Sequence, residues 1–158
     1  MITLNRLSVF IIVIVLTCSA SAQESRTGKM LRVEATQTNS GGEPAIKFTV
    51  ENTSAVTLEM YSADLPWANR YSIVVVVVTK NGAEMLPQSA PIDDAGPGTT
   101  IIKHGERLHG SRPLTSYVNG LNKAREKGDV LIFWFYGPKD TKGKKLGNFG
   151  GWLILPKI

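Results

Sequence analysis

The sequence has few of the residues that disulfide frameworks, metal sites and nucleophilic enzymes use. Its 158 residues include one cysteine, Cys18, and two histidines, His104 and His109. One cysteine cannot form an internal disulfide, so the class of small disulfide-stabilised domains is excluded. On one strand the two histidines would point to opposite faces, and a zinc site needs further ligands. We therefore expect no metal site and no cofactor.

Motifs of catalysis are also missing. The sequence contains no Gly-x-Ser-x-Gly nucleophile elbow. The acidic pair Asp93-Asp94 lies in a stretch rich in proline and glycine, which favours a solvated turn over an acid/base pair. The glycine-rich residues 147–151 precede an expected strand, so they lack the helix N-terminus of a phosphate-binding loop. We expect no catalytic residues and predict that the protein is not an enzyme.

The N-terminus has the pattern of an export signal. A charged start with Arg6 is followed by the apolar run Leu7 to Leu16 and by the small residues Ala20-Ser21-Ala22. The apolar run is shorter than the roughly 20 residues that span a bilayer. We predict a signal peptide over residues 1–22 and a periplasmic or extracellular location. Cleavage after Ala22 and anchoring through Cys18 both stay open.

The remaining chain is the size of one domain. We expect a disordered N-terminal segment over 23–29 and a single domain over 30–158. The formal net charge is +5, which is compatible with an anionic partner such as an envelope polymer or a lipid headgroup.

Two segments are apolar on both faces and are expected at the centre of the fold. Tyr71 to Thr79 contains five consecutive valines, and Val130 to Tyr136 reads Val-Leu-Ile-Phe-Trp-Phe-Tyr. β-branched and aromatic residues favour strands, and a strand without a polar face must be covered on both sides. We therefore predict two central strands with both faces buried.

The other segments predict a sheet protein with little helix. Residues 30–37, 45–51 and 56–61 alternate between apolar and polar side chains, as strands with one wet face do. Leu114 to Lys127 has helical spacing and is followed by Gly128, a typical helix stop. The prediction is an all-β, immunoglobulin-like antiparallel β-sandwich of about seven or eight strands, with one short helix before the penultimate strand.

A family resemblance points the same way. Phe48 to Ser54, then Leu58 to Ser62, then the turn Lys103 to Glu106, followed by an apolar strand near the end, resembles the bacterial immunoglobulin-like modules. Within these it is loosely similar to the intracellular proteinase-inhibitor domain. The resemblance implies a β-sandwich and a binding function.

Two groups of residues are candidates for contact with a partner. Aromatic side chains commonly anchor interfaces, and the first group consists of Trp67, Trp134, Tyr136 and Trp152. The alternative for these residues is that a loop or the helix covers them within the core. The second group is basic and lies in one hairpin loop: Lys139, Lys142, Lys144 and Lys145. This loop is either a solvated charge cluster or a contact with an anionic surface.

The expected function is therefore that of an exported, non-catalytic binding module of the bacterial envelope or extracellular space. Its partner would be a protein, a second copy of the chain included, or an anionic envelope component. No specific nucleic acid and no membrane-spanning segment after signal cleavage are expected. The second hypothesis is an inhibitor of a protease or another envelope enzyme that acts through a loop such as Ser62 to Asn69. An enzyme is the third.

Overall fold

The computed structural model describes residues 30–80, 84–88 and 98–158. The predicted signal peptide over 1–22, the segment 23–29 and the pair Asp93-Asp94 lie outside these residues. Within the described part of the chain, no helix is long and apolar enough to cross a membrane.

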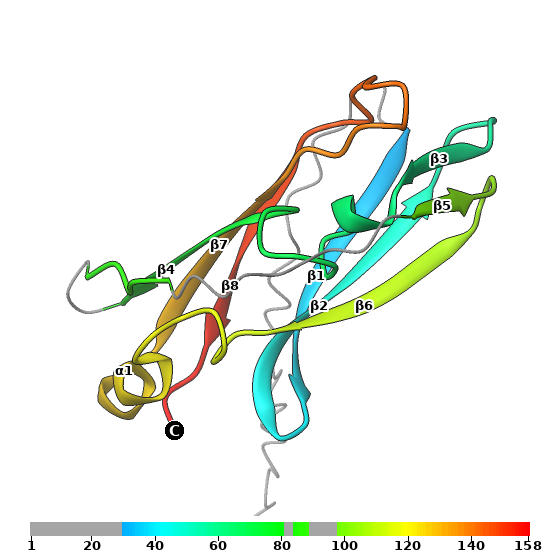
Figure 1. Cartoon of the computed structure of the whole chain (residues 1–158). Coiled ribbons are helices and arrows are strands. Elements are labelled where there is room, and N and C mark those ends of the chain that lie inside the picture. Colours follow the sequence, from blue (N-terminus) through cyan, green and yellow to red (C-terminus); the bar gives the residue numbers. More distant parts are fainter. Residues whose placement is uncertain (1–29, 81–83, 89–97) are drawn as a thin grey trace, which may run out of the picture.

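Among the described residues, eight strands and one short α-helix make up the fold (Figure 1). In chain order these elements are β1 (Leu31–Ser40), β2 (Glu43–Asn52), β3 (Leu58–Tyr61), the 3-10 turn η1 (Ser62–Asp64), β4 (Val74–Thr79), β5 (Thr99–Ile102), β6 (Arg107–Pro113), α1 (Leu121–Lys127), β7 (Val130–Tyr136) and β8 (Phe149–Leu155). They form three antiparallel sheets, ordered β1-β2-β6, β3-β5 and β4-β7-β8. The predicted all-β fold with one helix before the penultimate strand is confirmed, whereas the immunoglobulin-like connection pattern stays a prediction.

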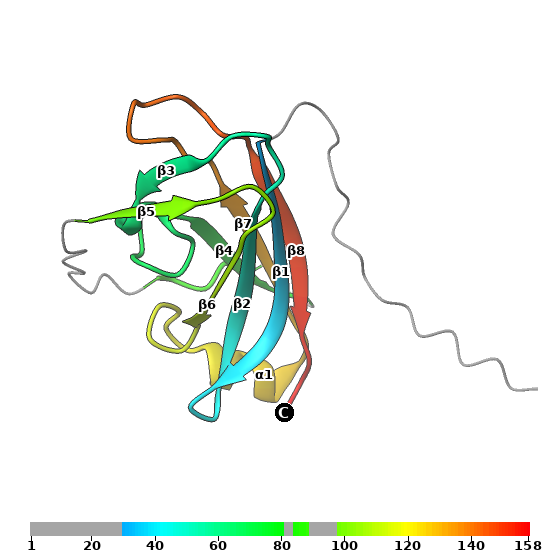
Figure 2. The ribbon, with the colours of Figure 1, turned by 90° about the vertical axis from the view of Figure 1, so that its right-hand side faces the viewer.

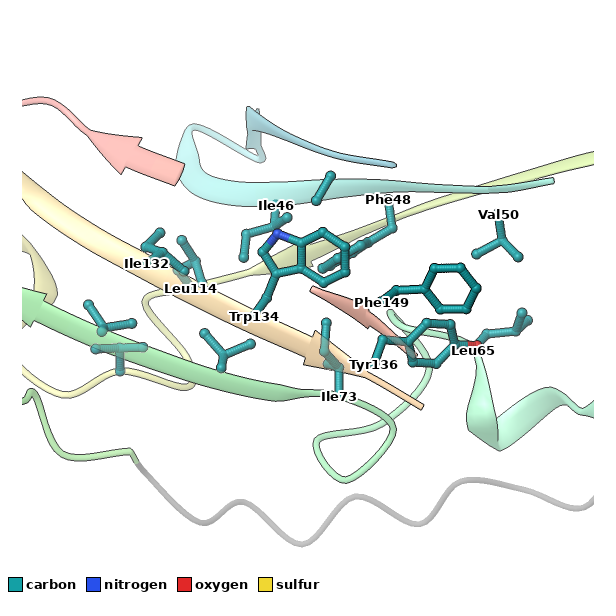
Figure 3. Close-up of a cluster of buried hydrophobic side chains, with 14 of the residues drawn as sticks. Ile46, Phe48, Val50, Leu65, Ile73, Leu114, Ile132, Trp134, Tyr136 and Phe149 are labelled. Atoms are coloured by element: carbon teal, nitrogen blue, oxygen red, sulfur yellow. The ribbon is translucent and has the colours of Figure 1, made fainter. Parts of the chain in front are cut away.

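The two three-stranded sheets face each other as layers, and the core lies between them. Figure 2 shows β1 beside β8 where the layers meet on one side. The rings of Phe48 on β2 and Trp134 on β7 meet edge to face, with centroids 5.5 Å apart and an interplanar angle of 81° (Figure 3). Edge-to-face aromatic pairs stabilise a core beyond the area that they bury. This contact joins the strand at the centre of each sheet.

The helix is shorter than its sequence pattern predicts. It begins at Leu121, and the prediction of a helix from Leu114 is wrong. Gly120 has a φ of 75°, a left-handed conformation that interrupts a right-handed helix. Residues 114–118 instead form a turn, in which the Val118 N–H donates to the Leu114 carbonyl over 2.8 Å. Both of these side chains are buried, so their helical spacing reflects a buried turn.

The valine strand also begins later than predicted, at Val74. The side chain of Asn69 organises the preceding turn, because its Oδ1 accepts hydrogen bonds from the backbone N–H of Tyr71 over 2.7 Å and of Ser72 over 3.0 Å. This is the local competition by which asparagine favours turns over strands.

Candidate interaction surface

The β4-β7-β8 sheet turns one face to the core and the other outward, and every outward residue is apolar. The cross-strand registers arrange nine residues in three rows, which together we call the outer apolar face: Val74, Phe135 and Gly150; Val76, Phe133 and Trp152; Val78, Leu131 and Ile154. The alternate residues of each strand point inward (Figure 3).

Several side chains of the outer apolar face are open to solvent. Val74 is 58% exposed, Phe135 is 55% exposed and Trp152 is 47% exposed. The prediction that both faces of β4 and β7 are covered is therefore wrong for this side. Met85 pairs with Val78 at the edge of β4 that β7 does not cover; it is also exposed and extends the apolar surface. Contiguous exposed apolar surface of this kind marks interaction sites in folded proteins.

Two glycines of β8 set the positions of two large rings of β7. A Cβ on Gly150 would lie 3.1 Å from Cδ1 of Phe135 and 3.0 Å from the Trp134 carbonyl oxygen. On the inner side, a Cβ on Gly151 would lie 3.1 Å from Nε1 of Trp134. The ring of Phe135 therefore rests against the backbone of β8 on the outer face, and the indole of Trp134 does so on the inner face. Rings that cover glycines in this way stabilise a sheet.

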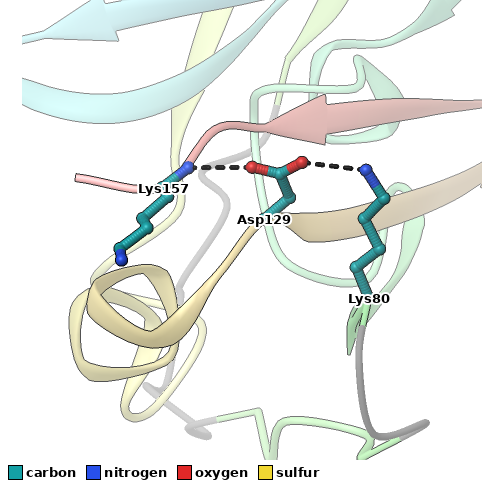
Figure 4. Close-up of polar contacts among 3 residues, drawn as sticks. All are labelled: Lys80, Asp129 and Lys157. Carbon is teal, nitrogen blue, oxygen red and sulfur yellow. Dashed lines mark hydrogen bonds and ion pairs between the residues drawn. The ribbon is translucent and has the colours of Figure 1, made fainter.

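An ion pair, whose two charges cancel, borders one end of the outer apolar face. Nζ of Lys80, just after β4, lies 3.0 Å from Oδ2 of Asp129, just before β7 (Figure 4). The backbone N–H of Lys157 donates to Oδ1 of the same carboxylate over 3.1 Å. The hydrogen bond from Lys80, followed by that from Lys157, lowers the pKa of Asp129, while partial desolvation opposes the shift. The carboxylate thus stays charged and paired at neutral pH.

The four predicted aromatic contact residues do not share one surface. Trp134 and Tyr136 lie in the core, with Trp134 1% exposed, so their assignment to an exposed face is wrong. The indole fills the space between the sheets, and it is the opposite face of β7 that carries the exposed ring of Phe135. Trp152 does lie on the outer apolar face. The sequence showed that β7 has two apolar faces, but which one points inward depends on the position of the other sheet.

Trp67 lies elsewhere and is half-buried. Its indole packs on Gly110 of β6, where a Cβ would come within 2.1 Å of Cδ2. The loop that carries Trp67 is held to β6 by Arg112, a buried residue. Nε of Arg112 donates to the Pro66 carbonyl over 3.1 Å, and Nη2 donates to the Asn69 carbonyl. The loop Ser62 to Asn69 is thus fastened to the sheet, and its use as an inhibitory loop stays a prediction.

The two histidines make separate local contacts. Nδ1 of His109 lies 3.0 Å from Oγ1 of Thr49, and Nδ1 of His104 lies 2.6 Å from the carbonyl oxygen of Ser54. Among the described residues, no group of three or more His, Cys, Asp or Glu side chains could hold a metal ion.

Arg112 also lines a small hollow, together with Arg70, Gln88, Tyr117 and apolar side chains. The guanidinium of Arg112 lies 4.9 Å from the centre of the Tyr117 ring and donates hydrogen bonds to the carbonyl oxygens of the loop. These contacts give the arginine a structural role, as the clip between the loop and the sheet.

Hydrogen bonds hold the backbone of the lysine loop between β7 and β8 in place. All four of its predicted contact residues, Lys139, Lys142, Lys144 and Lys145, are exposed. Oδ1 of Asp140 accepts hydrogen bonds from the backbone N–H groups of Lys142 and Lys144 over 2.9 and 2.8 Å. The Thr141 N–H donates to the Glu59 carbonyl of β3 over 3.0 Å, which ties the loop to a neighbouring strand. The loop therefore presents its four charges from a fixed backbone.

Comparison with known proteins gives no family for this chain, since no protein-family description and no curated protein matches it. Among solved structures, it is similar to one described as "X-ray structure of Northeast Structural Genomics Consortium target SoR45". The TM-score is 0.37 at 10% identity, and the alignment covers 80% of this chain and 86% of that chain.

Proposed function

We propose that the protein is an exported, non-catalytic binding module that contacts a protein partner through the outer apolar face. The observation that carries this proposal is the exposure of Val74, Phe135 and Trp152 on a sheet face with no polar side chain. Trp residues dominate the energetics of many interfaces, and rings held against a rigid sheet lose little conformational freedom on binding.

The amount of exposed surface supports a contact by the whole face. The exposed halves of Phe135 and Trp152 offer ~100 Å² each, whose burial contributes about 5 kcal/mol at about 25 cal/mol per Å². Association costs roughly 4–15 kcal/mol in lost freedom, so these two rings alone do not hold a partner. The neighbouring aliphatic rows must also be covered, which favours a broad, complementary protein surface over a small ligand.

A crosslinking pull-down from the native envelope tests the proposal. Trp152→Ser removes an exposed ring from the outer apolar face, and Tyr71→Ser removes an exposed ring outside it as the matched control. We expect Trp152→Ser to lose the crosslinked partner while Tyr71→Ser retains it, with both variants folded by circular dichroism. Equal capture by wild type and Trp152→Ser would refute the use of this face.

The lysine loop supports a second candidate function, contact with an anionic envelope component. Its four exposed lysines stand on a backbone fixed by Asp140 and Thr141. Such a contact is electrostatic and adds to the apolar one without replacing it.

A further inference from the structure

We infer that the partner on the outer apolar face is a second copy of this chain, packed sheet against sheet about a two-fold axis. The inference rests on the proposed function, because it names the occupant of the same face. Three features of the face support it: its area, its lack of charge and its regular rows.

The area of the face matches the lower end of what a specific dimer needs. If a fully exposed aromatic side chain offers roughly 150–250 Å² and an aliphatic one somewhat less, the exposed parts of the face amount to on the order of 500 Å². Two such faces bury about 1,000 Å² in total, the size at which specific interfaces begin. We therefore expect a reversible dimer whose population depends on concentration.

The charge distribution allows two identical faces to meet. The chain has a formal net charge of +5, so two copies repel each other, and charged residues in the contact would add to this repulsion. None of the nine residues of the outer apolar face is charged or polar. At its border, Lys80 and Asp129 neutralise each other within one chain over 3.0 Å. Interfaces of homodimers are more apolar than those of transient complexes, as this face is.

The regular rows give the geometry of the contact. Sheets pack face to face about 10 Å apart with their strands within about 30° of alignment, and side chains of each sheet fill the spaces of the other. A two-fold contact joins the same patch on both copies. The middle row, with Phe133 at the centre of the central strand β7, then lies at the axis. The row that contains Val74 on one copy then faces the row that contains Ile154 on the other copy.

Sedimentation equilibrium of the protein, expressed from the full chain and purified as the cell exports it, tests the inference. Val74→Lys places a charge on the face at a position 58% exposed, so the fold tolerates it. Val56→Lys is the matched control, because Val56 is 54% exposed and lies outside the face. We expect the wild type and Val56→Lys to dimerise over about 1–200 μM, and Val74→Lys to raise the dimer Kd at least ~100-fold, since a lysine buried against its own copy has no partner.

The salt dependence of dimerisation gives a second test. Because the contact is apolar and the two chains carry like net charge, added salt should strengthen the dimer. A monomeric wild type at every concentration overturns the inference, and so does a dimer that Val74→Lys leaves unchanged. If the wild type is monomeric but Trp152→Ser still loses a crosslinked envelope protein, the proposed function holds with a different partner. If neither assay responds to the face, both fail.

Discussion

The indole of Trp67 lies directly over Gly110, so that a Cβ on the glycine would be 2.1 Å from Cδ2 and 2.2 Å from Cγ of the ring. Gly110 is opposite Phe48 in the register of β2 and β6. The glycine thus lets a distant loop dock flat on a strand whose neighbour supplies the centre of the core. This contact explains why a glycine stands in the middle of β6.

We expect Gly110→Ala to destabilise the protein by about 1–3 kcal/mol, because overpacking forces the indole or the strand to move. Urea unfolding followed by circular dichroism measures the change. Adding Trp67→Ala should recover part of the loss, since the double variant no longer has a ring above the new methyl group. Gly137→Ala is the control, because its Cβ would meet only Oδ1 of Asn148 at 3.5 Å. Equal effects at both glycines would contradict the packing argument.

Arg112→Lys tests the clip that holds the same loop. A lysine cannot reproduce the fork by which Arg112 donates to the carbonyls of Pro66 and Asn69. We expect a loss of about 2 kcal/mol or more, because buried carbonyls lose charged donors. Limited trypsin digestion should then cut faster after Arg70, the residue that follows the released loop. Arg107→Lys on the same strand, where the arginine is exposed and pairs with Glu51 over 3.2 Å, should change little.

The central strand β7 shows which features of the fold can be predicted from the sequence alone. The segment Val130 to Tyr136 is a strand with the predicted bounds, as its aromatic and β-branched residues favour. Its alternating residues form two sets, one of Ile132, Trp134 and Tyr136 and the other of Leu131, Phe133 and Phe135. Period-two alternation cannot say which set faces the core, because both are apolar. That choice depends on the opposite sheet, where Phe48 meets Trp134 edge to face.

The outer apolar face was missed for a related reason. It requires the register of three strands, and only pairing places Trp152 beside Phe133 and Phe135 next to Gly150. The two consecutive glycines 150 and 151, opposite two large aromatic residues, were the available signal. Glycines within a strand mark close approach by a neighbouring ring.

Tyr136→Phe should stabilise the protein modestly. Within the described part of the chain, the buried Tyr136 hydroxyl has no hydrogen-bond partner. Removing an unsatisfied hydroxyl is expected to gain up to about 1 kcal/mol near neutral pH. Urea unfolding at about pH 8, below the ordinary tyrosine pKa, measures this gain. Tyr71→Phe, at an exposed position, should have no effect.

The same variant should also change the response to alkali. Burial, with a smaller contribution from the charge of Asp64, raises the pKa of Tyr136 far above its ordinary value of 10.0. The unfolded chain therefore loses this proton first, and wild-type stability should fall as the pH rises above about 10. Tyr136→Phe should lack this part of the fall, while the lysine titrations are common to both proteins. Parallel stability curves up to about pH 11 would contradict the burial of the hydroxyl.

Asp129→Asn should show the opposite pH dependence. Because the hydrogen bonds from Lys80 and Lys157 lower the pKa of Asp129, its stabilising effect is present above 3.8, the ordinary value, and is lost as the pH falls through the folded-state pKa. We expect wild type to be more stable than the variant at neutral pH and equal to it in acid. Lys80→Gln should reproduce much of the loss, and salt should reduce it, since the pair lies at the surface. A difference that persists in strong acid would assign the effect to something other than the charge.

Binding of the lysine loop to an anionic surface should be electrostatic and therefore weakened by salt. We expect wild-type retention on vesicles with anionic headgroups to fall steeply as salt is added, and the change Lys142→Ser to weaken it about 5-fold at low salt, near 1 kcal/mol per lysine. Lys123→Ser removes the same charge from an exposed position on α1 and is the control. Retention that salt leaves unchanged would exclude this contact. The response is opposite in sign to that of the dimer, which salt should strengthen, so a salt titration read by both vesicle retention and molecular mass separates the apolar contact from the charged one.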